Sequence, residues 1–412
     1  MERKKKPNTQ AQRHLAAQYR ANFFRKMKLI IDSVCGTNIY PLIPQSVLDD
    51  AYLCRSAPFK IIAAYNNNIP SKLLKDTKVI LPNLIKQEII SLPPVNLEIS
   101  LNDFYTVLFT IIILQARISE TSFNNAHKVK AALAQFVSYT SKNREAKTLL
   151  YNILNSYNFG YNDLRKTLYW FKHDIVLPKA LPAETENIIH AYSLIPETIN
   201  VRVDDISRPA IRVGWALPYT GAEWVSIKPS VLGFKGPFSE IPLKVYIQLH
   251  AINRLLERID CFWQGIIQFN MFCSLAKPKY TYDNNNNLLI EYIFFGTKAG
   301  YFRADIIDGI ILLRTFLFIT NNGTPEGQLL EKNTGLKKLD KKYLAIDKLS
   351  TFMTADLDKN DEVQRIFKTS GCQCLLDLYE KMKPLVTKHA NGFDSELMLK
   401  YITNPNTEIA DN

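Results

Sequence analysis

The chain has 412 residues, of which 47% are hydrophobic and 22% charged, as expected of a globular protein with two or three domains. Its 51 Lys and Arg against 39 Asp and Glu leave a net charge of +12, which favours an acidic partner such as nucleic acid. Six scattered cysteines argue against a disulfide-rich secreted scaffold, and the N-terminal residues lack the apolar core of a signal peptide, so we expect a cytoplasmic protein.

Residues 10–175 are predicted to form a mostly helical domain. Ser100 with Asp103 three residues later predicts a capped helix start. The apolar run that follows is too short to span a bilayer, so we expect a buried helix and no membrane insertion. The segments with helical spacing are 10–34, 104–116, 143–158 and 161–176.

A stretch with two prolines, VLPKALPAE at 176–184, predicts a linker after the helical domain. Beyond it, alternating Val- and Ile-rich runs predict that 195–350 is an α+β domain with an antiparallel sheet. The Asn cluster at 284–287 and the Asp308-Gly309 dipeptide predict the turns of two hairpins.

Two helical segments are predicted at the C-terminal end of the sequence. The first is a capped helix, with Thr324 as its N-cap, Pro325 at its first position and Gly335 just past its end. The second is the segment 355–403, which is also predicted to be helical. The predicted fold class is therefore α+β, with a helical N-terminal domain, a central antiparallel sheet and a helical C-terminal segment.

The stretch VYIQLHAINRLLERID, residues 245–260, predicts an amphipathic helix that precedes the sheet. His250, Arg254 and Arg258 stand four residues apart and share one stripe of it. The simplest interpretation is an ordinary polar helix face. The alternative is a site for RNA cleavage, because attack by a 2′-hydroxyl needs proton transfer and positive charge around the phosphate, which histidine and arginine supply without a metal.

The sequence HAINRLLERID resembles the His-Ala-x-x-Arg-apolar-x-x-Arg motif of small toxin-like domains of the RelE and barnase/EndoU/colicin ribonuclease type. The resemblance extends from His250 to about Thr320 and implies helices followed by about four antiparallel strands. It also implies a metal-independent endoribonuclease, with His250 as the motif histidine and Arg254 and Arg258 as its arginines.

The strands expected after this helix offer further candidate residues for the same site. Arg303 shares a strand face with Tyr301, whereas Arg314 and Thr315 are adjacent and point to opposite faces, so only one of these two can join Arg303. We therefore expect Arg303 and Arg314 to be the other candidate catalytic residues. RNA is the favoured partner. The rival hypothesis is a non-enzymatic basic protein that binds nucleic acid or builds an assembly, such as a component of a mobile element or phage.

Other motifs are weaker, and we expect no cofactor and no metal. Cys372 and Cys374 lack a second ligand pair at zinc spacing, and 356–367 departs from a calcium-binding loop at its glycine and glutamate positions. At the N-terminus, basic residues including Arg3 and Lys4 favour contact with phosphates, whereas Phe23 and its neighbour favour a buried helix face.

Overall fold

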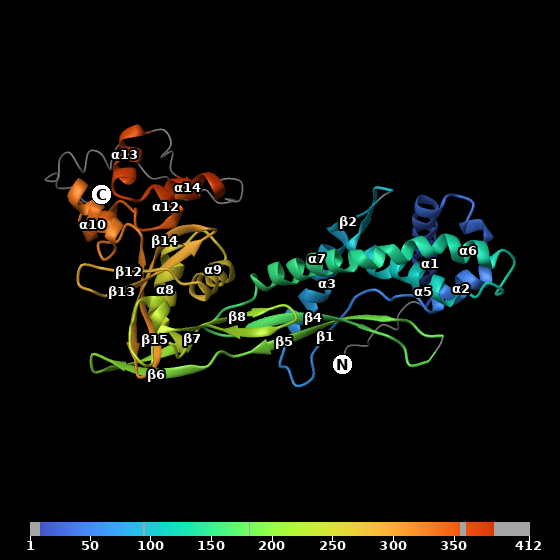
Figure 1. Cartoon of the computed structure of the whole chain (residues 1–412), viewed down its shortest axis with the longest axis horizontal. Helices are drawn as coiled ribbons and strands as arrows, with labels where there is room; N and C mark the ends of the chain where they lie inside the picture. Colours follow the sequence, from blue (N-terminus) through green and yellow to red (C-terminus); the bar gives the residue numbers. More distant parts are fainter. Residues whose placement is uncertain (1–8, 94, 181, 355–359, 383–412) are drawn as a thin grey trace. The chain divides into compact units, whose positions relative to one another are not determined.

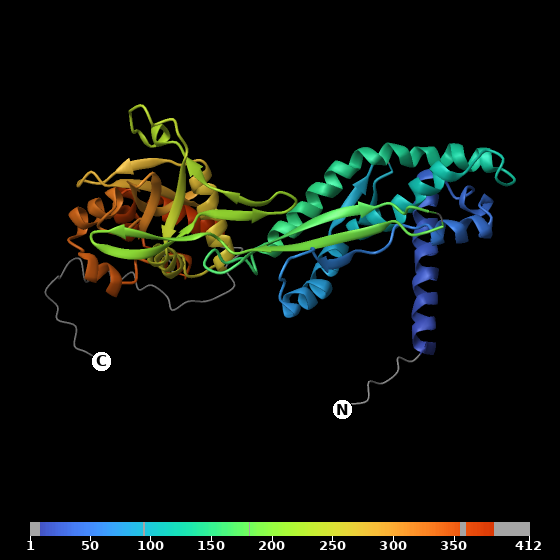
Figure 2. The same ribbon diagram turned by 90° about the horizontal axis from the view of Figure 1, so that it is seen from below.

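The protein forms two compact units, both drawn in Figures 1 and 2. The first contains the chain up to Tyr157 together with Trp170–Ser193, and the second contains Asn158–Tyr169 together with the chain from Leu194 onward. Helices and strands occur in both units, so the predicted α+β class is confirmed. The computed structural model describes residues 9–93, 95–180, 182–354 and 360–382.

Helices dominate the first unit. Ser100 begins one of them as predicted, because its Oγ accepts a hydrogen bond from the N–H of Asp103 at 3.1 Å. The apolar run that follows is largely buried, in a π-helical turn, Phe104–Leu108, and in α5. The helices are α1 (Thr9–Cys35), α2 (Gln45–Leu53), α3 (Ser71–Gln87), α4 (Leu101–Asp103), α5 (Phe109–Arg117), α6 (Ala126–Leu133) and α7 (Asn143–Asn158), with 3₁₀ turns at Tyr40–Leu42 and Ala134–Lys142.

The helix predicted at 161–176 is wrong, because this segment ends in a strand, β4 (Leu168–Val176). In the described residues, β4 lies beside β5 (Glu186–Leu194) in a sheet whose third strand is β1 (Lys60–Ala63). The stretch 176–184 therefore connects two strands of one sheet and is not a linker between domains. A short apolar run suits a helix or a strand, and here the partner strands decide. A separate hairpin pairs β2 (Ile89–Leu92) with β3 (Leu97–Ser100).

The second unit is built on a sheet that, within the described chain, has the path β12-β13-β14-β15-β11-β7-β6, with β10 paired to β11. The pairing of β11 with β15 is parallel, and the other strand pairs are antiparallel. The strands are β6 (Thr198–Val203), β7 (Ile206–Arg212), β10 (Ser226–Ile227), β11 (Leu243–Gln248), β12 (Tyr280–Tyr282), β13 (Leu288–Phe294), β14 (Thr297–Ile307) and β15 (Ile310–Phe318), with β8 (Gly214–Leu217) and β9 (Gly221–Trp224) forming a separate hairpin.

The helix predicted over 245–260 begins later than expected. Residues 245–248 are buried and belong to β11, which lies between β7 and β15, and α8 (Leu249–Arg258) starts directly after it. Ala251, Ile252 and Leu255 form the buried face of α8, which packs against β15. α9 (Gln264–Ala276) follows and packs against β13.

Both predicted hairpins are confirmed. Asp308 and Gly309 join β14 to β15 with φ of 48° and 75°, the two positive values that a tight hairpin turn of this kind requires. Asn286 lies in the turn between β12 and β13 with φ of 58°. Asparagine tolerates this conformation better than most residues.

The capped helix at Thr324 is also confirmed, because its Oγ1 accepts a hydrogen bond from the N–H of Gly327 at 3.0 Å. Of the segment 355–403 predicted as helical, 360–382 is described and contains two helices, while 355–359 and 383–403 lie outside the described residues. The C-terminal helices are α10 (Pro325–Thr334), α11 (Lys338–Tyr343), α12 (Leu349–Thr354), α13 (Asp361–Thr369) and α14 (Gln373–Met382). Earlier in the second unit, a 3₁₀ turn at Pro229–Leu232 lies between β10 and β11. No helix in the described chain has the length and apolar character to cross a membrane.

Gly327 lets α10 approach the loop after β15, and we expect Gly327→Ala to destabilise the protein. A Cβ at this position would lie 1.8 Å from the carbonyl oxygen of Asn321. Alanine normally favours a helix over glycine by about 1 kcal/mol, so a loss of about 1–3 kcal/mol in the free energy of unfolding identifies the clash. Urea unfolding measures it. Gly323→Ala, which meets only side-chain atoms at 3.2 Å or more, is the control, and equal stability of the two variants would contradict the tight packing.

Candidate functional site

The polar face of α8 carries the three residues that the sequence analysis placed on one stripe. His250 lies in the first turn, is exposed, and has no hydrogen bond or ion pair among the described residues. Arg254 donates a hydrogen bond from Nη1 to Oε2 of Glu257 at 3.0 Å and is 42% exposed. Arg258 is only 14% exposed and forms an ion pair with Asp347. The stripe thus passes from an exposed histidine to a partly buried arginine within three turns.

Arg254 and Arg258 line a cavity of about 250 Å³. The residues of its wall come from α8, from the loop after β15 and from the region of α11. Only one carboxylate, that of Asp347, is among the described lining residues, although Glu257 outside the wall pairs with both arginines. We call this the basic cavity. Its cationic residues in the described chain are Arg254, Arg258, Lys338, Lys341 and Lys342.

Lys341 is the most buried cation of the basic cavity, with 2% of its surface exposed. Its Nζ donates hydrogen bonds to Oδ1 of Asn322 at 2.6 Å and to the carbonyl oxygen of Gly327 at 2.7 Å. Both acceptors are neutral, and burial lowers the pKa of Lys341 to about 8, although the charges of Glu331 and Asp340 act in the opposite direction. An ammonium group has three N–H donors, and a buried charge is unfavourable unless a counter-charge compensates it. This arrangement favours an anion that enters from solvent.

Asp347 is the buried carboxylate of the basic cavity, with 9% of its surface exposed. One oxygen accepts a hydrogen bond from Arg258, while Oδ1 has no hydrogen-bond partner within the described part of the chain. Burial raises the pKa of Asp347, although the charge of Arg258 acts in the opposite direction. The guanidinium of Arg258 is thus fixed in place by a carboxylate that is itself poorly solvated.

The strand arginines lie elsewhere in the second unit. Arg303 donates to Oδ1 of Asn287 at 2.8 Å, while Arg314 donates to Asp305 at 3.0 Å and to Asp204 at 2.7 Å. Thr315 pairs with Arg303 in register, and a register shift after Arg303 leaves Arg314 without a paired residue on β14. Arg314 lines a broad, open hollow of about 700 Å³ whose wall also includes both of its carboxylate partners.

The five expected catalytic residues are therefore not gathered in one cavity. Arg254 and Arg258 line the basic cavity, and His250 is exposed one helical turn before Arg254 without being one of the lining residues. Arg303 and Arg314 are held by partners on and beside the sheet. Tyr301, considered with them, is buried and donates to Glu326 at 2.9 Å.

The lysines of α11 were missed by the sequence analysis. They follow α8 by about 80 residues, and nothing in the local pattern LKKLDKKYL indicates which helix they approach. The only signal was the large number of lysines in this stretch, and such a stretch more often forms a solvent-exposed helix face. Burial of Lys341 depends on α10 and on the loop that carries Asn322, and both are tertiary features.

The other motifs remain without a site in the described residues. No group of three or more His, Cys, Asp or Glu side chains in the described chain could hold a metal ion. Arg3 and Lys4 lie outside the described residues. Phe23 is buried in α1, as its interpretation as a core residue predicted. His173 is also buried, donates a hydrogen bond from Nε2 to Oδ1 of Asn187 at 3.1 Å, and has its pKa lowered to about 4 by burial.

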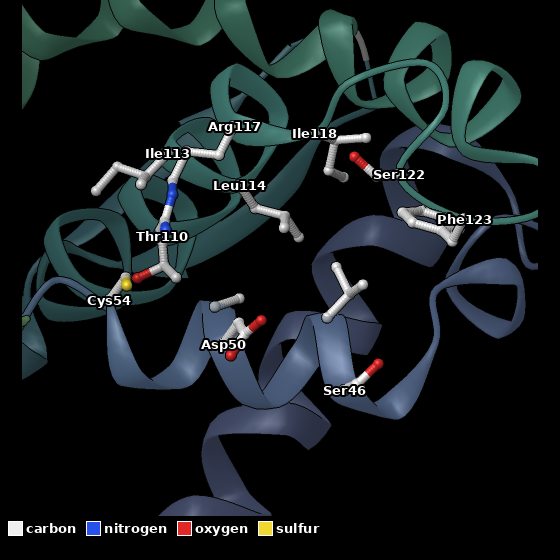
Figure 3. Close-up of a pocket in the computed structure, with 12 residues that line it drawn as sticks. Ser46, Asp50, Cys54, Thr110, Ile113, Leu114, Arg117, Ile118, Ser122 and Phe123 are labelled. Carbon is white, nitrogen blue, oxygen red and sulfur yellow. The ribbon is translucent and has the colours of Figure 1, made fainter. Parts of the chain in front are cut away.

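A second cavity, of about 380 Å³, lies in the first unit (Figure 3). Ser46 and Asp50 reach it from α2, and Thr110, Leu114 and Arg117 reach it from α5. Its charged lining residues are one of each sign, so it lacks the excess of positive charge that distinguishes the basic cavity.

We expect Arg258→Met to lower the free energy of unfolding far more than Arg254→Met. Removing one member of a buried ion pair costs about 3–5 kcal/mol, and the partly buried pair of Arg258 with Asp347 approaches the lower end of that range. The exposed pair of Arg254 with Glu257 contributes at most about 1 kcal/mol. Urea unfolding of both variants measures the difference, and similar losses in the two would contradict the buried position of Arg258.

The order of elements that the toxin-like resemblance implies, helices followed by antiparallel strands, is present from α8 to β15. An element order does not define an activity, so the ribonuclease assignment stays a prediction. Comparison with family models, with curated proteins and with solved structures finds no match. The chemistry of the basic cavity and of the adjoining face of α8 is therefore what indicates a function for this chain.

Proposed function

We propose that the protein binds nucleic acid, with RNA as the favoured polymer, through phosphate contacts made by the basic cavity. The observation that carries the proposal is Lys341, a buried ammonium whose hydrogen-bond acceptors are neutral, beside two arginines. Phosphate oxygens are strong acceptors for such groups, and arginine can bind them through two parallel hydrogen bonds.

The distribution of charge around the basic cavity supports a polymeric anion. Lys338 and Lys342 are exposed and line the same cavity as the buried Lys341, so positive charge continues from the interior to the surface. The whole chain carries a net charge of +12, which attracts polyanions over long distances at low ionic strength.

We expect the double variant Lys338→Gln/Lys342→Gln to bind single-stranded RNA more weakly and with a smaller dependence on salt. Each lost phosphate contact reduces the slope of log K against log salt by about 0.7, so two lost contacts reduce it by about 1.4. Fluorescence anisotropy across a salt series measures both quantities.

The control is Lys75→Gln/Lys78→Gln, which removes two exposed charges from α3 in the first unit. This variant keeps the wild-type affinity and slope if the basic cavity is the site. Absence of any RNA or DNA binding at low ionic strength, or an equal loss in the control, would overturn the proposal.

A second candidate function is a metal-independent endoribonuclease. It is favoured by the position of His250, an exposed histidine without a partner in the described chain, one helical turn before a lining residue of the basic cavity. In this mechanism the histidine would take the proton of the 2′-hydroxyl or protonate the 5′-leaving oxygen. The cations of α8 would stabilise the charge that develops on the phosphorus.

We expect His250→Ala to reduce RNA cleavage by about 10²- to 10⁴-fold while leaving RNA affinity unchanged, if this second candidate is correct. Cleavage is measured in EDTA, and the products carry a 2′,3′-cyclic phosphate. His127→Ala, which removes an exposed histidine from α6, is the control. Equal cleavage by all three proteins, or none by any of them across mixed RNAs, would leave nucleic-acid binding as the function.

A further inference from the structure

We propose that the basic cavity receives the phosphomonoester at the end of a nucleic-acid chain, in preference to a phosphodiester within the chain. This inference rests on the proposed function and names the part of the nucleic acid that the basic cavity recognises. It follows from the burial of the lining residues, the size of the cavity and the charge of the two kinds of phosphate.

The burial of the lining residues changes across the wall of the basic cavity. Lys338 and Lys342 are exposed, whereas the side chain of Arg258 is 14% exposed and the residues Asp347 and Lys341 are 9% and 2% exposed. A phosphate that contacts the buried ammonium must therefore enter the basic cavity and cannot remain on the protein surface.

The volume of the basic cavity limits what can enter it. At about 250 Å³ it lies just below the range of about 300–1,000 Å³ that is usual for small-molecule pockets. A terminal phosphate carries a substituent on one oxygen only and can enter with its other three oxygens leading. An internal phosphodiester carries a nucleoside on both sides, so the chain would have to pass into and out of the same small space.

The charges of the basic cavity also favour a monoester. A phosphomonoester has a second pKa near 6 and carries close to two negative charges at neutral pH, whereas a phosphodiester carries one. Five cations in the described wall face one lining carboxylate, Asp347, while Glu257, Glu331 and Asp340 act on these cations from outside the wall. The pair of Arg254 with Glu257 is exposed and therefore weak, so Arg254 can turn to an entering phosphate.

Lys341 has a defined place in this binding mode. Two of its three N–H donors are directed to Asn322 and Gly327, which orients the ammonium group and leaves one donor for a ligand. Its protonated form becomes more favourable when a dianion is bound, because the dianion adds negative charge beside the buried ammonium. Lys341 is thus the residue on which selection of the monoester depends most.

The test compares one RNA sequence in three forms: with a 5′-phosphate, with a 3′-phosphate, and with hydroxyl groups at both ends. The full-length protein is titrated at low salt and binding is followed by fluorescence anisotropy. We expect one phosphorylated form to bind about 10- to 100-fold more tightly than the form with two hydroxyl ends, as a set of charge-assisted hydrogen bonds predicts. Adenosine monophosphate and inorganic phosphate, added as competitors, distinguish a polymer end from a free phosphate.

We expect Lys341→Met to lose the preference for the phosphorylated end, measured as the ratio of the affinities of the phosphorylated and hydroxyl forms for this same variant. Lys332→Met, at an exposed position of α10, is the matched control and retains the preference. Circular dichroism establishes whether Lys341→Met folds. If it does not, the exposed double variant Lys338→Gln/Lys342→Gln serves instead, and it is expected to reduce the preference.

The outcomes separate this inference from the proposed function. Equal binding of the three RNA forms overturns selection of a terminal phosphate and leaves nucleic-acid binding standing. No binding of any form overturns the proposed function itself. Adenosine monophosphate that binds as tightly as the phosphorylated RNA overturns recognition of a polymer end, because the ligand would then be a free phosphomonoester.

Discussion

The parallel pairing of β11 with β15 is the constraint on which the candidate site depends. Lys244 to Ile247 pair with Ile310 to Leu313 in the same direction, so the chain leaves both strands toward the same end of the sheet. β15 continues to Phe318 beyond this pairing, α8 starts after β11 and packs against β15, and the loop that carries Asn322 follows β15. A helix and a loop about 70 residues apart in sequence are thereby brought together to form the basic cavity.

The basic cavity combines a cation that has a carboxylate as its hydrogen-bond partner with a buried cation whose hydrogen-bond partners are neutral. Arg258 has Asp347, whereas the ammonium of Lys341 has only an amide and a carbonyl oxygen as acceptors. A buried lysine of this kind reduces stability unless an anion joins it, and side chains that reduce stability in this way are often retained for function. Stability and anion binding are therefore linked at Lys341.

The two candidate functions share this cavity and differ in what His250 does. Its exposure leaves it free to meet a bound nucleic acid, but its side chain is not held by any described residue. A general acid or base works best when a neighbouring group orients it, and such a group is present for Arg258 and Lys341 and absent for His250 in the described chain. Nucleic-acid binding does not need an oriented histidine, whereas catalysis by His250 does.

The sequence by itself determined the features that depend on neighbouring residues: the fold class, the cap at Ser100, the turn at Asp308-Gly309 and the amphipathic face of α8. Only the tertiary structure decided that 161–176 ends in a strand and that 245–248 belong to the sheet, because distant strands pair with them. The tertiary structure also placed residues of α8 and α11 in the wall of one cavity, the basic cavity, and left Arg303 and Arg314 outside that wall. The physical reason is that turns and caps are local hydrogen-bonding choices, whereas strand pairing and the burial of a lysine depend on partners that local periodicity does not reveal.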